Sequence, residues 1–114
     1  MSLIYKILPR ELWEAALVKG RFDGAGVDLR DGYIHFSTAA QAPETARLYF
    51  RGQADLVVLE VEAGALGESL KWEPSRGGDL FPHLYAHLAC ADVIAVRAAP
   101  LDADGVPLLE LSGQ

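Results

Sequence analysis

The chain has 114 residues, of which 51% are hydrophobic and 9% aromatic, and these values predict a single domain over residues 1–114 with a packed core. Its formal net charge of −6 arises from 16 acidic and 10 basic residues spread along the chain, which argues against non-specific nucleic-acid binding, because that needs clustered Lys and Arg. One or two arginines would still suffice for an anionic small molecule. The single Cys90 cannot form an internal disulfide, and no apolar stretch approaches the roughly 20 residues that span a bilayer, so we expect no membrane association and a cytoplasmic location.

Hydrophobic periodicity and turn residues divide the chain into short helices and strands. Helical spacing of apolar residues occurs in the first half, whereas β-branched runs typical of strands occur throughout. This distribution favours an α+β fold with antiparallel sheets over a doubly wound parallel fold. The expected elements, in chain order, are a strand at Leu3–Leu8, a helix at Arg10–Lys19, a loop at Arg21–Gly32, a strand at Tyr33–Ser37, a turn and then a helix from Pro43 to near Arg51, a strand at Asp55–Glu62, a short strand at Leu70–Glu73, a turn at Pro74–Asp79, a strand at Val93–Ala98, a turn at Asp102–Gly105 and a return strand at Val106–Leu111.

The strand at 33–37 carries three polar side chains on one face. Successive side chains of a strand point to opposite faces, so the two apolar residues would face the core while Tyr33, His35 and Ser37 line the other side. An aromatic ring, an imidazole and a hydroxyl in a row would suit a ligand that has a ring and hydroxyls. The alternative is an exposed sheet face with a satisfied histidine.

A second polar segment, residues 81–85, reads Phe-Pro-His-Leu-Tyr. The proline biases the residue before it to an extended conformation, and in a strand His83 and Tyr85 would share a face. Upstream, Arg76 is followed by two glycines, which can present backbone donors to an anion. An ordinary turn is the alternative for that segment.

Metal and nucleophilic chemistry have weaker support. In a helix, His83 and His87 would share a face and could bind zinc with a third ligand such as His35, but nothing brings that ligand near, so we expect no metal site. The chain has neither a Gly-x-Ser-x-Gly elbow nor a phosphate-binding Gly-x-x-x-x-Gly-Lys loop. Glu60 and Glu62 share a strand face, which we interpret as solvated.

Taken together, these segments resemble an uncharacterised bacterial family, the domain-of-unknown-function family numbered 952. The family has no established reaction. The resemblance implies a fold like that of the ADP-ribosyltransferases, with two small, mostly antiparallel sheets and two short helices around an NAD-sized cleft. The segments that carry it are residues 4–7, 32–37 with Gln41, Trp72-Glu73, 81–85 and 102–107.

The histidine strand is also similar to the His-Gly-Ser/Thr strand of ADP-ribosyltransferases and to the His-Leu-Ser segment of RNA 2′-phosphotransferases. This likeness implies that His35 contacts a ribose hydroxyl of NAD or another nucleotide and that Ser37 supports it. A neutral imidazole can donate to one hydroxyl and accept from another. The transferases' catalytic glutamate has no clear counterpart, and Glu73 is the best-situated carboxylate. Where the family often shows Gly-Pro, this chain has Ala86-His87, which argues against His87 in a shared site.

Three hypotheses of function follow. The first is a nucleotide-type ligand site, with ADP-ribosyl or phosphoryl transfer as its reaction. Tyr33 or Tyr85 would stack on a ring and Arg76 would meet phosphate. Glu73 or His83 would act as acid, base or electrostatic stabiliser. The second is a non-catalytic module that binds a protein or metabolite, and the third is a phosphoesterase of the two-histidine kind, which needs two His-x-Ser/Thr motifs where this chain has one. The sequence does not indicate an oligomeric state.

Overall fold

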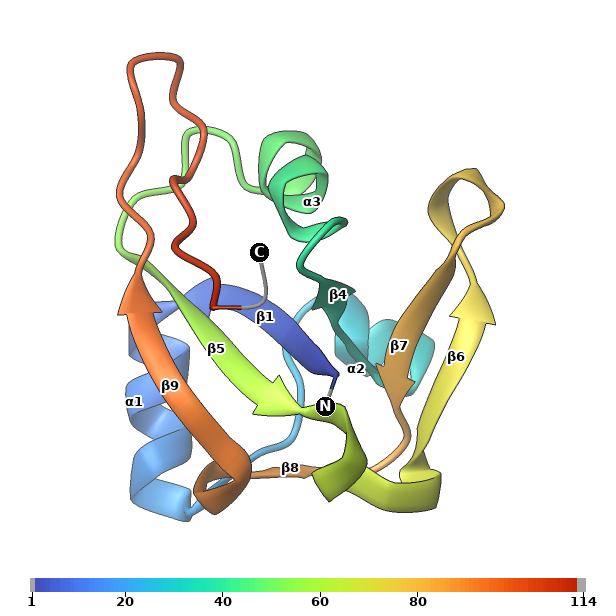
Figure 1. The fold of residues 1–114 in the computed structure, drawn as a ribbon. Coiled ribbons are helices and arrows are strands. Elements are labelled where there is room, and N and C mark those ends of the chain that lie inside the picture. The colour runs from blue at the N-terminus through green and yellow to red at the C-terminus, as the bar shows by residue number, and fades with distance from the viewer. Residues whose placement is uncertain (1, 113–114) are drawn as a thin grey trace.

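A four-stranded antiparallel sheet forms the centre of the molecule (Figure 1). The structure is a computed structural model that describes residues 2–112. The two middle strands are the β-branched runs expected from the sequence, and they pair along their whole length, from Leu3 opposite Glu62 to Pro9 opposite Leu56. The strands in spatial order are β4 (Ser37–Thr38), β1 (Leu3–Pro9), β5 (Leu56–Glu62) and β9 (Val93–Ala98).

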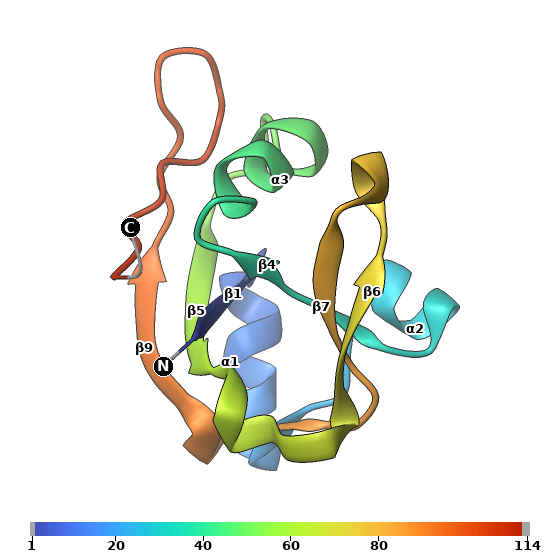
Figure 2. The same cartoon turned by 45° about the vertical axis from the view of Figure 1, so that its right-hand side comes forward.

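Two smaller antiparallel sheets complete the strand arrangement. One contains β3 (Ile34–His35), β7 (Leu80–Leu84) and β6 (Leu70–Pro74), and the other pairs β2 (Arg21–Phe22) with β8 (Leu88–Ala89). Figure 2 shows the sheet of β6 and β7 standing apart from the central sheet, with the chain passing between them from β3 to β4. The expected α+β class with antiparallel sheets is confirmed.

Helices α1 (Arg10–Lys19) and α3 (Ala42–Tyr49) cover opposite faces of the central sheet. Trp13 of α1 packs in a core that includes alternate residues of β5, while Ala42 and Ala46 of α3 pack on the residues between them. The two faces of β5 therefore pack in two different cores, which explains why five of its seven residues are apolar. Short 3₁₀ helices lie at Ala63–Ser69, Arg76–Gly78 and Cys90–Asp92.

Four expectations of local structure are wrong. Arg21–Gly32 is not a plain loop, because it contains β2 and an additional helix, α2 (Val27–Asp31). The glycines on either side of α2 are typical of turns and led to the prediction of a loop. The Tyr33–Ser37 strand is divided at Phe36 between two sheets. Residues 2–112 therefore form three sheets and three α-helices instead of two of each. Finally, Val106–Leu111 forms no strand, and only an isolated bridge joins Leu101 to Pro107.

The turn before α3 is built as its sequence indicated. Thr38 and Gln41 exchange hydrogen bonds: the Thr38 N–H donates to Gln41 Oε1 at 3.0 Å, and the Gln41 N–H donates to Thr38 Oγ1 at 3.2 Å. Pro43 then lies in the first turn of α3, where its missing N–H costs no helical hydrogen bond. This reciprocal pair joins β4 to α3.

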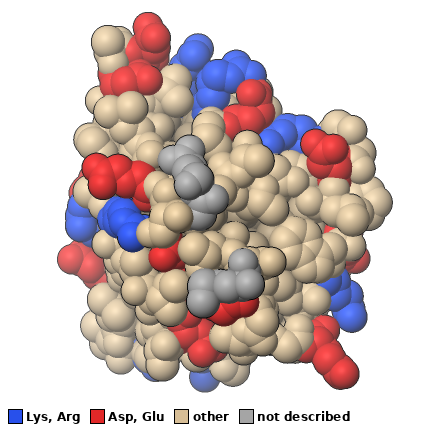
Figure 3. Space-filling view, viewed as in Figure 1, with Lys and Arg blue, Asp and Glu red and all other residues tan. Residues whose placement is uncertain are grey.

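Acidic and basic side chains are interspersed on the face that Figure 3 shows. One correction concerns Glu60, which was interpreted as solvated but is only 4% exposed and accepts a hydrogen bond from Arg97 at 3.0 Å. None of the helices formed by residues 2–112 has the length and hydropathy needed to cross a bilayer.

Candidate functional site

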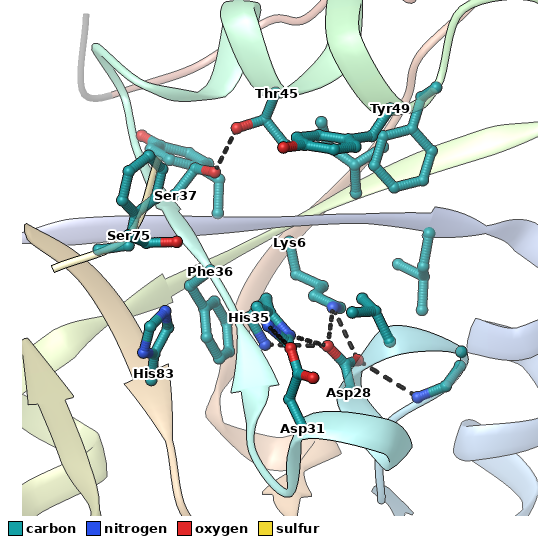
Figure 4. Close-up of a pocket in the computed structure, with 18 of the residues that line it drawn as sticks. Lys6, Asp28, Asp31, His35, Phe36, Ser37, Thr45, Tyr49, Ser75 and His83 are labelled. Atoms are coloured by element: carbon teal, nitrogen blue, oxygen red, sulfur yellow. Dashed lines mark hydrogen bonds and ion pairs between the residues drawn. The ribbon is translucent and has the colours of Figure 1, made fainter. Parts of the chain in front are cut away.

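A cavity of about 710 Å³ lies where β1, α2, α3 and the two larger sheets meet (Figure 4). Its wall combines apolar side chains with polar groups that come from distant parts of the chain. This composition is typical of a small-molecule site, in which a few polar groups fix the orientation of a ligand. The polar lining residues that define the site are Lys6, Asp28, Asp31, His35, Ser37, Thr45, Arg76 and His83.

A buried ion pair lies at one end of the cavity. The Lys6 ammonium donates to both carboxylate oxygens of Asp28, at 3.0 and 2.8 Å, and the Asp28 side chain is only 1% exposed. The same carboxylate accepts the backbone N–H of Ala25 at 3.2 Å and that of His35 at 3.0 Å. Asp28 therefore ties β1 and the start of α2 to β3.

This pair holds an anionic carboxylate in a buried position. Burial raises the pKa of Asp28, but the hydrogen bonds from His35 and the charge and hydrogen bonds of Lys6 outweigh it and hold the pKa at about 2. Burial also lowers the pKa of the Lys6 ammonium, and the neighbouring Asp28 offsets part of that change. Asp28 thus stays ionised at any physiological pH.

His35 is held between two carboxylates. Its Nδ1 lies 2.6 Å from Asp28 Oδ1, and its Nε2 lies 3.0 Å from Asp31 Oδ2, near the end of α2. The αL conformation of Gly32, with φ of 86°, ends α2 immediately before β3 and so keeps Asp31 close to the imidazole. Figure 4 shows His35, Asp28 and Asp31 gathered at one end of the cavity.

His83 lies on the neighbouring strand, directly opposite His35 in the β3–β7 register. The two ring centroids are 5.4 Å apart. His83 Nδ1 is 2.8 Å from Glu73 Oε1, and the Tyr85 hydroxyl donates to the same oxygen at 2.7 Å. The hydrogen bonds from Tyr85 and then His83 lower the pKa of Glu73, while the bond to Glu73 raises the pKa of Tyr85 to about 12.

The opposite end of the cavity holds a guanidinium. Arg76 lies over the ring of Phe81, at 4.9 Å from its centroid, and near that of Tyr49, at 5.9 Å. It donates to Thr45 Oγ1 at 3.2 Å, and Thr45 is also 3.0 Å from Ser37 Oγ. Among residues 2–112, no carboxylate forms an ion pair with Arg76, so its charge is left for an anion in the cavity.

The residues singled out from the sequence fall into two groups. The first lines the cavity and consists of His35, Ser37, Arg76 and His83. The second, consisting of Tyr33, Glu73 and Tyr85, is not among the lining residues of this cavity. The Tyr33 ring stacks on His83 at 4.1 Å and lies 5.1 Å from the Tyr85 ring, so the second group surrounds His83. Tyr33 and Tyr85 also line a smaller cavity of about 300 Å³.

Sequence reasoning missed Lys6, Asp28, Asp31 and Thr45. Lys6 had a usable signal, because it is the one charged residue in the otherwise apolar strand predicted at Leu3–Leu8. A charge in a strand with two buried faces needs a partner. The partner, Asp28, had no signal of its own, since it is one of several charges in a glycine-rich segment.

The zinc alternative depended on a helix that would bring His83 and His87 onto one face. Residues 80–84 form β7 instead, so that spacing has no meaning here. In the part of the chain that the structure describes, no three His, Cys, Asp or Glu side chains are grouped as metal ligands.

Comparisons with known proteins agree with this architecture. Residues 7–96 match the family described as Protein of unknown function (DUF952). The chain belongs to this family. It is 59% identical to protein CC0527 from Caulobacter crescentus, whose crystal structure superposes with a TM-score of 0.93 over 95% of each chain. A solution NMR structure of CC0527 gives 60% identity and a TM-score of 0.85, over 94% of this chain and 92% of that one.

A crystal structure of a double methionine variant of CC0527 also matches, with 57% identity and a TM-score of 0.93 over 95% of each chain. No curated protein matches the chain. The family and these structures carry no named activity, so the function has to be argued from the cavity.

Proposed function

We propose that the cavity binds a nucleotide-type ligand, a ribose that carries a phosphate group. The observation that carries this proposal is the division of the cavity wall into two polar ends. One end presents the guanidinium of Arg76 with neighbouring hydroxyls, and the other presents the imidazole of His35 between two carboxylates. A phosphate needs a positive charge and hydrogen-bond donors, which the Arg76 end has, whereas ribose hydroxyls need both donors and acceptors, which the His35 end has.

The Arg76 end suits phosphate. A guanidinium has five N–H donors, and Arg76 uses one nitrogen on Thr45, so most donors remain for phosphate oxygens. The aromatic rings of Phe81 and Tyr49 hold the guanidinium in place, which lowers the entropy lost on binding. The Ser37 and Thr45 hydroxyls add polar groups beside it.

The His35 end suits ribose hydroxyls. Its two ring nitrogens contact carboxylate oxygens, and a vicinal diol would donate one hydroxyl to Asp31 and place the other oxygen where Asp31 now contacts His35 Nε2. The sequence likeness to ADP-ribosyltransferases supports the same role for His35. Glu73 bonds to His83 and Tyr85 outside the cavity lining, so the proposal concerns binding and assigns Glu73 no direct contact with a ribosyl centre.

Calorimetry with NAD, ADP-ribose and adenosine 2′-phosphate tests the proposal. We expect measurable heat with at least one of them, and Arg76→Gln should weaken that binding by about 10- to 100-fold, since a charge-assisted contact contributes about 1.5–3 kcal/mol. His35→Ala should weaken binding as well.

Arg10→Gln is the matched control, because it removes the same charge from an exposed arginine that pairs with Asp55 and does not line the cavity. Its affinity should equal that of the unaltered protein. An absence of heat with all three ligands would refute the proposal, and equal weakening by the two arginine variants would remove the phosphate assignment.

A further inference from the structure

Two imidazoles meet in this cavity on neighbouring strands, and both are held in the same way. His35 and His83 are register partners, and each presents its Nδ1 to a carboxylate, Asp28 at 2.6 Å and Glu73 at 2.8 Å. A carboxylate on Nδ1 fixes the orientation of the ring and directs Nε2 elsewhere. Both rings line the cavity that also contains Arg76.

The two Nε2 atoms have different surroundings. His35 Nε2 lies 3.0 Å from Asp31 Oδ2, so both of its contacts are hydrogen bonds only when the ring carries two protons. His83 Nε2 forms no hydrogen bond with any described residue, so a ring that donates from Nδ1 to Glu73 leaves an unprotonated nitrogen there. The arrangement therefore offers one proton donor and one proton acceptor.

We infer that His83 and His35 are the general base and general acid of a phosphodiester hydrolysis, and that the substrate class is the ribonucleoside 2′,3′-cyclic phosphates. This inference rests on the proposed binding of a phosphorylated ribose in the same cavity. Arg76 and the Ser37–Thr45 hydroxyls line the same cavity as the two imidazoles and would hold the phosphoryl group, which in a cyclic phosphate is joined directly to the ribose oxygens at the His35 end. The net charge of −6 and a cavity of about 710 Å³ favour a small cyclic nucleotide over a long RNA strand.

The reaction balances with water as the only co-reactant. His83 Nε2 accepts a proton from water while the water oxygen forms a bond to phosphorus. The bond from phosphorus to one ribose oxygen breaks, and that oxygen takes the electron pair and a proton from His35 Nε2. The product is a nucleoside monophosphate with one free ribose hydroxyl, and the proton on His83 returns to His35 through solvent.

Four other residues have defined parts in this scheme. The leaving oxygen takes the place of Asp31 beside His35 Nε2. Asp28 and Glu73 are positioning residues, because they act through the imidazoles, and Lys6 keeps Asp28 in place.

The test is to incubate the protein with adenosine 2′,3′-cyclic phosphate and follow the monoester by phosphorus NMR across pH. We expect turnover with a bell-shaped pH profile, and a loss of about 100-fold or more in His35→Gln and in His83→Gln. His87→Gln is the control, since this histidine is exposed and does not line the main cavity, and its rate should be unchanged. Because His83 is buried, Glu73→Gln is tested in parallel and should alter the limb of the pH profile that reports the base.

Adenosine 2′-phosphate binding is measured by calorimetry on every variant, and this separates the two proposals. A protein that binds this nucleotide but does not open the cyclic phosphate overturns the acid–base inference and leaves the binding proposal standing. A protein that does not open the cyclic phosphate and binds none of adenosine 2′-phosphate, NAD and ADP-ribose overturns both. Turnover that survives in His35→Gln or His83→Gln also overturns the inference.

Discussion

Replacing Asp28 with Asn should destabilise the protein more than any surface substitution. The change keeps the shape of the side chain but leaves the Lys6 ammonium, whose side chain is 10% exposed, without its anionic partner. Removing one member of a buried ion pair costs about 3–5 kcal/mol, because the other charge stays buried. Domains of this size have about 5–15 kcal/mol of total stability, so the loss is a large fraction of the whole.

Urea unfolding followed by tryptophan fluorescence measures this loss, and we expect the midpoint of Asp28→Asn to fall by about 1–3 M. Asp23→Asn is the matched control, since it breaks exposed pairs with Lys19 and Arg21 and should leave the urea midpoint nearly unchanged. The double variant Lys6→Met/Asp28→Asn should recover part of the loss, because it buries no charge. Equal effects of Asp28→Asn and Asp23→Asn would refute this account of the buried pair.

Three other predictions concern stability. The pKa of Asp28 is about 2 in the folded chain, against an ordinary value of 3.8, so its ionisation stabilises the fold by about 2 kcal/mol. This stabilisation is fully present above about pH 5 and is lost as the pH falls through 2. Acid unfolding curves should therefore show a component that Asp28→Asn lacks. Arg97→Met should cost about 1–3 kcal/mol in thermal unfolding, because it removes the hydrogen bond to the buried Glu60, and an unchanged Tm would contradict this role. Gln41→Ala should cost about 1 kcal/mol in urea unfolding, because it removes the Oε1 acceptor of the Thr38 N–H and the Nε2 donor to the Leu80 carbonyl, and a stability equal to that of the unaltered chain would show that these side-chain bonds contribute nothing.

Apolar periodicity and turn residues predicted the helices and strands whose formation depends on their own sequence. The strand at 3–8, the helix at Arg10–Lys19 and the strand at 55–62 have clear apolar patterns, the first two are followed by Pro9 and Gly20, and the structure has all three. Helix α2 was missed because its five residues lie between glycines and are fixed by Asp28, whose partner Lys6 is 22 residues away. A contact at that separation has no local signature.

The predicted return strand at Val106–Leu111 is absent for a different reason. The turn at 102–105 forms as expected, with the Asp102 N–H donating to the Val106 carbonyl at 2.8 Å. Beyond the bridge from Leu101 to Pro107, the Leu108 N–H still donates to the Pro100 carbonyl at 2.7 Å, but Pro100 has no N–H to return that bond, so the ladder does not continue. The sequence therefore predicted the turn, whereas the length of the strand pairing depended on one missing backbone N–H.

The site was predictable where it depended on strand alternation. His35 and Ser37 line the cavity in agreement with the predicted alternation, but the agreement is partial, since Tyr33 of the same predicted face does not line it and Phe36 of the other face does. The pairing of His35 with His83 depends on the β3–β7 register, which joins strands nearly 50 residues apart, and the sequence alone contained no information on it. The roles of all these residues in ligand binding stay predictions.

A crystal structure of the protein with adenosine 2′-phosphate tests the central claim most directly. The account predicts phosphate oxygens within hydrogen-bond distance of the Arg76 guanidinium and a ribose hydroxyl beside His35, in the same cavity. A nucleotide bound elsewhere, or a cavity that stays empty at saturating nucleotide, would contradict it.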